Sequence, residues 1–300
     1  MRVTLIHNPG AGDTDQPGAK ALRKLIEAAG HELTYQSAAR EGWTDALDIE
    51  ADLVAVAGGD GTVGRVARRM AGRGVPLAVL PMGTANNIAR SLRLLGTPLE
   101  ELIAGWADAA RLRVDAALAQ GPWGERRFIE GLGMGLFAWT MPHAQDSKAL
   151  DQVQHAEDAV AHVLRMLRER LDNYRARPMA VTLDGQALSG EYVLLEVMNL
   201  SYIGPNLHLA PDAEPDDGQL HVVMVTEDER DRLHRYLEKW EDGRSPRIDL
   251  PTLEARHITI AEGDYQVHID DVLWSDEPVG ETRDISISVE PGVLEFLQAD

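Results

Sequence analysis

The sequence contains no cysteine. Disulfide bonds, thiolate metal sites and cysteine nucleophiles are therefore excluded, and a reducing cytoplasm is the expected compartment. No apolar run approaches the ~18–20 residues that a membrane-spanning helix requires. The first ten residues also lack the apolar core and cleavage site of a signal peptide, so we expect no secretory leader.

Three common catalytic motifs are missing as well. The sequence has no HExxH zinc motif, no GxSxG nucleophile elbow and no Walker A lysine loop. Zinc hydrolases, serine hydrolases and P-loop nucleotidases consequently find no support in the sequence.

Positive charge is scarce: 29 Lys and Arg residues stand against 49 Asp and Glu residues, for a net charge of −20. An acidic surface repels the phosphates of nucleic acids and of anionic lipids. We therefore expect no nucleic-acid partner. Any contact with a membrane would have to use local apolar surface.

The 300 residues are 44% hydrophobic, enough for one large or two medium domains. Over the first hundred residues, short apolar runs alternate with stretches of helical periodicity, which predicts an N-terminal doubly wound α/β domain with a parallel sheet. The expected strands cover 3–6, 33–35, 53–57 and 76–80, and the expected helices cover 19–29, 63–70 and 88–95.

The pattern changes near Arg113. Short strand-like runs then lie between glycine-rich turns and are interrupted by two helical stretches, at 156–174 and 230–240. This pattern predicts a mostly antiparallel, β-rich second domain. The expected boundaries are 1–113 together with 287–300 for the α/β domain, and 114–286 for the β-rich domain.

A glycine-rich loop follows the apolar run at 53–57 and opens a helix; it consists of Gly58, Gly59, Asp60, Gly61 and Thr62. Glycines allow the backbone to approach a phosphate, and a helix N-terminus offers N–H groups to an anion. A carboxylate beside phosphates needs a divalent cation between them, so Asp60 suggests Mg²⁺. The alternative is a structural turn in which Asp60 caps the helix.

Two further loops follow predicted strands. One contains Gly83, Thr84, Asn86 and Asn87, whose short polar side chains suit phosphate or ribose contacts, although they could simply cap the next helix. The other runs from Asn8 to Gly12 after the first strand. Three such loops at one edge of a sheet describe a nucleotide site better than any one of them does.

In this order, the segments NPGAG (8–12), GGDGT (58–62) and PMGTANN (81–87) resemble those of the diacylglycerol kinase catalytic-domain family, which includes bacterial lipid kinases and sphingosine kinases. That family is more distantly similar to NAD kinases and phosphofructokinases. The resemblance extends over nearly the whole chain, since NLSYIG (199–204) and APDA (210–213) followed by DDG (216–218) also match family segments.

The resemblance implies that ATP binds in a cleft between the two domains, with Asp60 helping to hold the nucleotide Mg²⁺. Gly59, Thr62, Thr84 and Asn86 would line the phosphates and the nucleoside. It also implies a second, structural Mg²⁺ bound by Asp217 with backbone oxygens near Glu214 and Gln219, since hard cations prefer oxygen ligands. The alternative for residues 216–218 is a turn between strands.

The sequence departs from the family pattern at three positions. Arg65 stands where the family has Glu, and Asn87 stands where Asp is common. A late D-G-E motif, whose Glu is thought to activate the lipid hydroxyl, matches residues 270–272 and leaves Val272 in place of that Glu. A second alignment places Glu277 there. Asp270, Asp271 and Glu277 are thus all candidate bases, and a solvated acidic hairpin is the alternative.

Two apolar segments are candidate walls for an acyl-chain groove. Residues 131–137 are expected to be flexible, whereas the apolar stripe of the helix at 156–174 is better explained as core.

We interpret the chain as an ATP- and Mg²⁺-dependent lipid kinase that phosphorylates a diacylglycerol-like hydroxyl, with Asp60, Asp271 and Glu277 as candidate catalytic residues. Its lipid substrate would lie at a membrane surface, which a cytoplasmic protein would meet peripherally and transiently. The alternatives are a catalytically impaired nucleotide- or lipid-binding relative and a kinase of a soluble polyol. The acceptor, the choice of ATP over other triphosphates, and a homodimer are left open.

Overall fold

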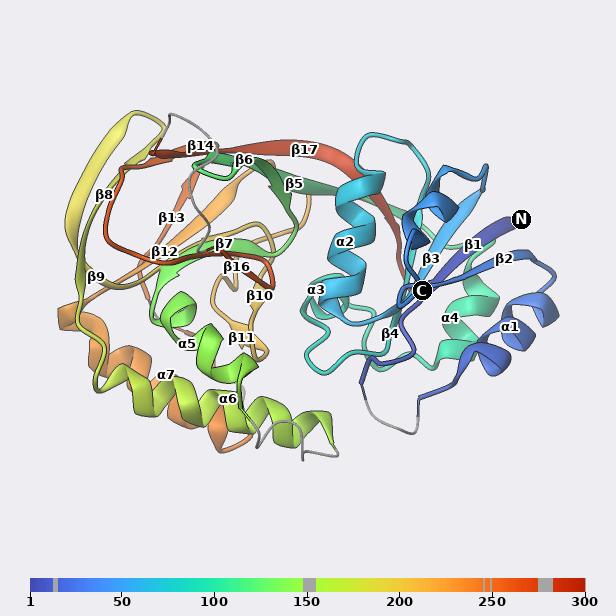
Figure 1. Ribbon diagram of the computed structural model, residues 1–300, viewed down its shortest axis with the longest axis horizontal. Helices are drawn as coiled ribbons and strands as arrows, with labels where there is room; N and C mark the ends of the chain where they lie inside the picture. The colour runs from blue at the N-terminus through green and yellow to red at the C-terminus, as the bar shows by residue number, and fades with distance from the viewer. Residues whose placement is uncertain (13–15, 148–154, 245, 249, 275–282, 300) are drawn as a thin grey trace. The chain divides into compact units, whose positions relative to one another are not determined.

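The computed structural model describes residues 1–12, 16–147, 155–244, 246–248, 250–274 and 283–299. The chain forms two compact units (Figure 1). The first unit comprises Met1–Val114, Gln154–Ala156 and Gly292–Asp300, and the second comprises Asp115–Val153 and Glu157–Pro291.

The first unit is built on a parallel sheet with the strand order β2-β1-β3-β4-β17. All six residues of β3 are buried, as expected for a parallel strand covered on both faces. The predicted doubly wound α/β architecture is confirmed. The strands are β1 (Arg2–His7), β2 (Glu32–Ser37), β3 (Leu53–Gly58), β4 (Leu77–Pro81) and the end of β17 (Ile285–Leu297).

Helices cover this sheet because their apolar stripes match its faces. Leu22 and Ile26 of α1 pack with Leu5 of β1 and with Ile103 of α4 in one cluster. The buried residues of α2 lie outside that cluster, and α2 packs against β3. The elements are α1 (Ala19–Ala28), α2 (Asp60–Met70), α3 (Asn87–Ser91), α4 (Leu99–Gly105) and the 3₁₀ helix η1 (Trp43–Asp48).

Helix α3 is shorter than predicted. The sequence pattern continued to residue 95, but the helix ends at Ser91. The N–H of Arg93 donates to the carbonyl of Arg90, and that of Leu94 to the carbonyl of Ala89. Arg93 takes a left-handed φ of 60°. These bonds form a Schellman motif, which normally has glycine at the left-handed position. Because arginine stands there, the end of α3 had no signal in the sequence.

The second unit is mostly antiparallel, as predicted, with the strand order β16-β15-β7-β9-β8-β14-β17 and with β12 pairing to β9 and β13. Its strands are β5 (Arg111–Gly121), β6 (Gly124–Phe128), β7 (Gly131–Gly135), β8 (Arg177–Leu183), β9 (Gln186–Met198), β12 (Leu220–Thr226), β13 (Thr252–Ala255), β14 (His257–Ile260), β15 (Val267–Ile269), β16 (Val272–Trp274) and the start of β17, with a separate hairpin of β10 (Tyr202–Ile203) and β11 (Leu207–His208).

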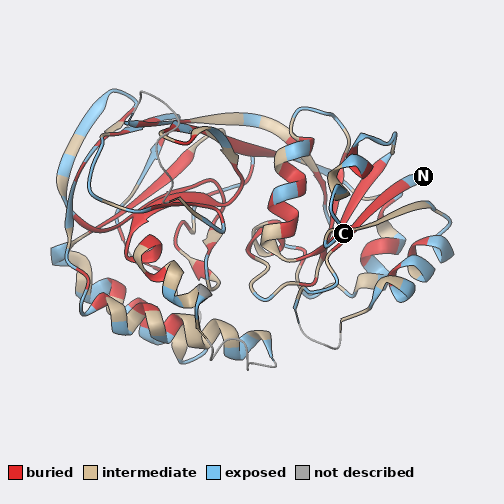
Figure 2. Cartoon of the chain, viewed as in Figure 1, coloured by how far each residue is buried: buried red, intermediate tan, exposed pale blue. Residues whose placement is uncertain are grey.

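Strand β9 separates two hydrophobic clusters, because successive side chains of a strand point to opposite faces. Leu195 and Val197 pack into a cluster formed by the strands themselves. Leu194 and Met198 pack into a cluster with the helices. Both faces of this strand are therefore buried over residues 192–198 (Figure 2).

The described residues of the second unit include the helices α5 (Leu136–Gln145), α6 (Ala156–Leu171) and α7 (Arg230–Glu241) and the 3₁₀ helix η3 (Glu227–Glu229). Leu164 and Leu167 of α6 are buried in one cluster with Leu233 of α7, so the apolar stripe of α6 is core. None of the described helices is long and apolar enough to cross a bilayer.

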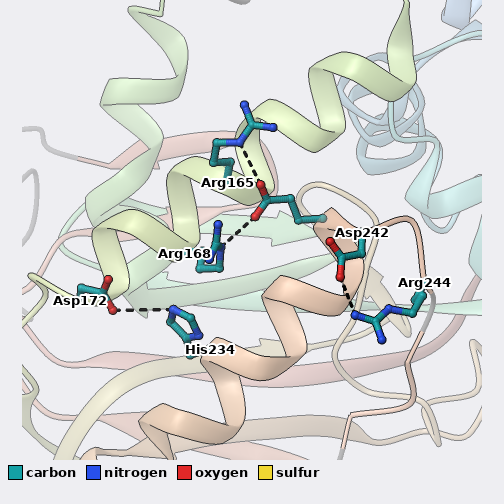
Figure 3. A network of polar contacts seen from close by, with 7 residues as sticks. Arg165, Arg168, Asp172, His234, Asp242 and Arg244 are labelled. Atoms are coloured by element: carbon teal, nitrogen blue, oxygen red, sulfur yellow. Dashed lines mark hydrogen bonds and ion pairs between the residues drawn. The ribbon is translucent and has the colours of Figure 1, made fainter.

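Polar contacts join the outer surfaces of α6 and α7 (Figure 3). The carboxylate of Glu241 accepts hydrogen bonds from Arg165 at 2.9 Å and from Arg168 at 2.8 Å. The imidazole of His234 lies 3.9 Å from the carboxylate of Asp172. Glu241 is largely buried between these two arginines, so these contacts add to the apolar cluster that already holds the helices together.

The prediction of a flexible segment at 131–137 is wrong. Residues 131–135 form strand β7, all of whose residues are buried, and α5 starts directly after it. Pairing with β15 on one side and β9 on the other fixes this glycine-rich strand. Tertiary pairing therefore overrides the weak intrinsic strand propensity of glycine.

A buried amide joins three segments of the second unit. The Nδ2 atom of Asn199 donates to the carbonyl of Asp115 at 3.0 Å and to the carbonyl of Ile129 at 2.8 Å. Asn199 is 2% exposed, so water cannot replace these bonds.

We expect Asn199→Ala to lower the free energy of unfolding by about 1–3 kcal/mol, because two buried carbonyls lose their donor. Urea denaturation followed by circular dichroism measures this change. Asn173→Ala is the matched control, since its Nδ2 donates to the exposed carbonyl of Glu169 on α6. Equal stability of the two variants would contradict the assigned role of Asn199.

Candidate functional site

Backbone contacts bring the three predicted loops together at the carboxyl ends of β1, β3 and β4. A Cβ atom on Gly83 would lie 2.3 Å from the Cα of Gly59, and one on Gly12 would lie 2.1 Å from the carbonyl oxygen of Met82. Gly12 also has a φ of 67°, in the left-handed region. These positions therefore require glycine.

The first and second loops are also joined by side chains. The Nδ2 atom of Asn8 donates to the hydroxyl oxygen of Thr62 at 3.2 Å. Thr62 is buried in the first turn of α2, under Gly58. Gly59 is the N-cap residue of that helix, and Gly61 follows in its first turn. The start of α2 therefore presents backbone N–H groups at the edge where the three loops meet.

Asp60 joins the second loop to the third. Its carboxylate accepts a hydrogen bond from the N–H of Ile88 at 2.9 Å, and further backbone bonds from the start of α3 stabilise its charged form. Burial outweighs these bonds and raises the pKa of Asp60. The alternative from the sequence was that Asp60 caps its own helix; the structure shows that it caps α3 instead.

The third loop is held by its own asparagine. Asn86 has a left-handed φ of 54°. Its side chain accepts a bond from the N–H of Gly83 at 2.8 Å and donates to the carbonyl of Gly83 at 2.7 Å. Asn86 stands at the N-cap position of α3 without a side-chain capping bond. Asn87 is buried and Thr84 is exposed.

This edge fits a phosphate group with a divalent cation. A carboxylate has about four lone-pair sites, and the backbone bonds that Asp60 accepts occupy them, so a metal ion would bind by replacing one of these bonds. Mg²⁺ commonly takes one or two protein carboxylates and completes its shell with phosphate oxygens and water. Asp60 therefore fits as a single protein ligand to a nucleotide-bound ion.

The acidic loop of the second unit has a different arrangement. The carboxylate of Asp217 accepts N–H bonds from Gln219 at 2.8 Å and from Glu214 at 3.1 Å, and it lies 2.9 Å from Nε2 of His221. Partial burial opposes the shift, but the bonds from His221 and the two backbone N–H groups together lower the pKa of Asp217.

The groups of this loop thus bond mainly to one another. Glu214 and Gln219 turn their N–H groups toward Asp217, whereas the predicted Mg²⁺ site requires their backbone oxygens. Among the described residues, no cluster of three or more His, Cys, Asp or Glu side chains could hold a metal. The arrangement does not fit a preformed magnesium cage, and the metal-binding role of Asp217, Glu214 and Gln219 stays a prediction.

The late acidic segment is a tight hairpin between β15 and β16. Asp270 has a left-handed φ of 49°. Its Oδ1 atom accepts N–H bonds from Ile129, Glu130 and Gly131 at 3.1, 2.9 and 3.3 Å. Asp270 therefore fixes backbone rather than facing solvent.

The neighbours of Asp270 are more accessible. Asp271 is exposed at the next turn position, and Val272 opens β16 with a 43% exposed side chain. Glu277, the other candidate base, lies outside the described residues.

The sequence interpretation assigned no role to His221, Glu196 and His268, and it named Asn199 only as part of a family segment; all four are buried and polar. Glu196 did carry a signal, because it is the one charged residue in the apolar run YVLLEVM (192–198). The role of His268 depends on pairing across strands and had no local signal.

A diacylglycerol kinase catalytic domain matches residues 2–118, and a YegS C-terminal NAD kinase beta sandwich-like domain matches residues 142–298. The chain belongs to the lipid kinase family that combines these two domains, whose members include diacylglycerol kinases and YegS-like lipid kinases. Membership places it among kinases, which transfer a phosphoryl group, and agrees with the loop order described above.

Named relatives extend over most of the chain. A diacylglycerol kinase of Mycobacterium tuberculosis is 25% identical and covers 88% of this chain and 89% of its own length. A Pseudomonas aeruginosa protein named "Probable lipid kinase YegS-like" is 29% identical and covers 97% of this chain and 92% of its own length.

Solved structures share the fold. A diacylglycerol kinase from Bacillus anthracis str. Sterne has a TM-score of 0.74 at 23% identity and covers 99% of this chain and 96% of its own. Yeast NADH kinase complexed with NADH has a TM-score of 0.53 at 10% identity and covers 100% of this chain and 84% of its own. The predicted distant similarity to NAD kinases is thereby confirmed at the level of fold.

We expect Gly83→Ala to lower the free energy of unfolding by about 1–3 kcal/mol, because the added methyl overlaps the backbone of Gly59 and the two loops must separate. Chemical denaturation measures the loss. Gly105→Ala is the control, since a Cβ there meets no atom within 4 Å. An equally small effect of both substitutions would show that the loops are not in close contact.

Asp60 should also make stability depend on pH. Because its folded-state pKa is raised above the ordinary 3.8, the protonated carboxyl contributes stability that is lost as pH rises through the folded pKa. We therefore expect wild type to lose stability relative to Asp60→Asn as pH increases from about 3.8 toward neutrality. Denaturation of both proteins across this range tests the sign. A difference that stays constant, or that grows in favour of wild type, contradicts it.

Proposed function

We propose that the protein is an ATP-dependent lipid kinase that transfers the γ-phosphoryl group to the hydroxyl of a diacylglycerol-like acceptor. The observation that carries the proposal is the contact of the three glycine-containing loops at one sheet edge, with Asp60 tied between two of them. Membership in a lipid kinase family supports the same reaction class.

The phosphates would lie against the first turn of α2, where Gly59 and Gly61 supply backbone N–H groups and Thr62 belongs to the same turn. Asn8, Gly12, Gly58, Gly83, Thr84, Asn86 and Asn87 complete the proposed nucleotide-binding set. A magnesium ion bound to the nucleotide would neutralise phosphate charge during transfer. Asp60 would hold that ion while its bonds to α3 keep the second and third loops together.

In the reaction, the bond between the γ-phosphorus and the bridging oxygen breaks, and a bond from the lipid oxygen to phosphorus forms. The hydroxyl proton passes to a carboxylate. Asp271 is the exposed candidate among the described residues, because Asp270 is committed to three backbone N–H groups. Glu277 is the other candidate from the sequence.

A diacylglycerol-like acceptor would lie at a membrane surface, which we propose the protein meets peripherally and transiently. With a net charge of −20, attraction to anionic lipid headgroups cannot supply this contact. The exposed side chain of Val272 next to Asp271 gives the proposed base an apolar flank. A lipid acceptor is therefore favoured over a soluble polyol.

A second candidate function is nucleotide or lipid binding with little or no transfer. It is favoured by one observation, namely that Val272 stands where the family motif places its base. Binding of ATP·Mg²⁺ without transfer to any acceptor would identify this case.

Transfer of radiolabel from γ-labelled ATP to diacylglycerol in mixed micelles tests the proposal, with calorimetry of ATP·Mg²⁺ binding beside it. We expect wild type to label the lipid, and both Asp60→Asn and Asp271→Asn to lower kcat by about 100-fold or more, because each removes a group acting at the transition state. Glycerol as acceptor and GTP as donor test the polyol and nucleotide alternatives.

Asp264→Asn is the matched control for Asp271→Asn, since Asp264 is exposed and pairs with Arg177 at the surface. Its kcat should equal that of wild type. A wild-type protein that binds ATP but labels no lipid, or an Asp60→Asn variant with undiminished kcat, would refute the kinase proposal. An active Asp271→Asn variant would transfer the base assignment to Glu277.

A further inference from the structure

An ion pair lies fully inside the second unit, on the face of the sheet that the helices cover. Nε2 of His268 on β15 is 3.1 Å from both carboxylate oxygens of Glu196 on β9. The side chain of Glu196 is 0% exposed and that of His268 is 3% exposed. None of the roles described above uses this pair.

A glycine makes the contact geometrically feasible. Strand β7 runs between β15 and β9, and Gly133 is the register partner of both His268 and Glu196. A Cβ on Gly133 would lie 2.0 Å from Oε2 of Glu196. The carboxylate and the imidazole therefore meet across β7 in the space that a side chain at position 133 would fill.

The pair is connected to the turn that follows β15. Nδ1 of His268 lies 3.1 Å from the carbonyl oxygen of Asp270, so it donates to that carbonyl while Nε2 faces Glu196. The carboxylate of Asp270 binds the N–H groups at the start of β7. The backbone of Asp270 is thus held by His268 and its side chain by β7.

The turn needs such support. Asp270 is a non-glycine residue at a φ of 49°, a conformation that persists where the surroundings impose it. The hydrogen bond from His268 acts on the peptide group that joins Asp270 to Asp271. It therefore sets the direction in which Asp271 leaves the turn.

A buried ion pair costs desolvation free energy, and apolar side chains of similar volume are often as stabilising or more so. Leu194 and Met198 occupy the same face of β9 as Glu196 and are apolar. Stability alone therefore does not account for Glu196 and His268.

The protonation state of the pair allows Nδ1 of His268 to remain a hydrogen-bond donor to the carbonyl of Asp270. Burial raises the pKa of Glu196. Burial lowers the pKa of His268, but the carboxylate of Glu196 and the hydrogen bonds outweigh it, so the net shift is upward. A proton is thus retained between the two groups, and Nδ1 can stay a donor.

Other titratable groups lie on the elements packed around the pair. They are Asp270 at the end of β15, Glu130 before β7, His221 on β12 and His143 on α5.

We infer that Glu196 and His268 are positioning residues that hold the Asp270–Asp271 turn in the geometry required for proton transfer from the acceptor hydroxyl. This inference rests on the proposed kinase function and adds two residues to its machinery. Neither residue touches substrate; both act through the backbone of the turn.

The test combines kinetics with hydrogen exchange. In the Glu196→Leu/His268→Leu double variant, the buried polar groups are removed together, so the fold should persist. We expect kcat for diacylglycerol in mixed micelles to fall by about tenfold or more, with KM for ATP within about twofold. Protection of the amides of Ile129, Glu130 and Gly131 against exchange should fall by a similar factor.

Conservative and control variants separate positioning from stability. Glu196→Gln can still bond to Nε2 of His268 and should retain kcat within about threefold of wild type. Leu195→Ala truncates the opposite face of the same strand and should lower stability without changing kcat or the protection of residues 129–131. If the double variant does not fold, His268→Gln carries the same test, since one amide cannot reach both Glu196 and Asp270.

A folded double variant, or His268→Gln, with wild-type kcat and wild-type protection at residues 129–131 would overturn the inference. So would an equal loss of kcat in Leu195→Ala. If wild type labels no lipid, the kinase proposal fails by itself. The exchange measurement then still decides the inference, because unchanged protection in these variants shows that the pair does not hold the turn.

Discussion

The candidate nucleotide site depends on one close approach, that of the backbones of Gly59 and Gly83. The loops after β3 and β4 can touch because neither residue carries a side chain at the contact. Asp60 then extends from one loop to the start of α3, just beyond the other, and satisfies backbone donors that would otherwise need water. Burial raises the pKa of this carboxylate although the backbone bonds oppose the shift, so a bound cation would stabilise its charged form.

Much of the first unit could be predicted from the sequence because its signals are local. Continuous apolar runs such as 53–57 mark strands buried on both faces, and glycine-rich segments after them mark the ligand edge. The loops did meet as expected. The end of α3 could not be predicted, since Arg93 occupies the left-handed position after the helix that is usually glycine. The partner of Asp60 was equally hidden, because it lies 28 residues further along the chain.

The second unit was harder to predict because its decisive contacts join distant segments. Residues 131–137 look flexible by composition, yet residues 131–135 form a strand between β9 and β15, in which Gly133 makes room for Glu196. Asp270 looked like a candidate base, but its carboxylate is committed to the backbone of residues 129–131. Asn199 shows the same principle, since one amide joins segments 84 and 70 residues away. Such roles follow from register, which periodicity alone does not determine.

Strand β17 has a consequence for how the protein is made. Its first residues pair with β14 in the second unit, and Phe296 near its end pairs with Leu77 of β4 in the first. During synthesis, the edge of β4 that pairs with β17 therefore stays unpaired until β17 has left the ribosome, although β1 to β4 were translated long before. An open strand edge can pair with other chains, so we expect the nascent protein to be prone to aggregation during this interval.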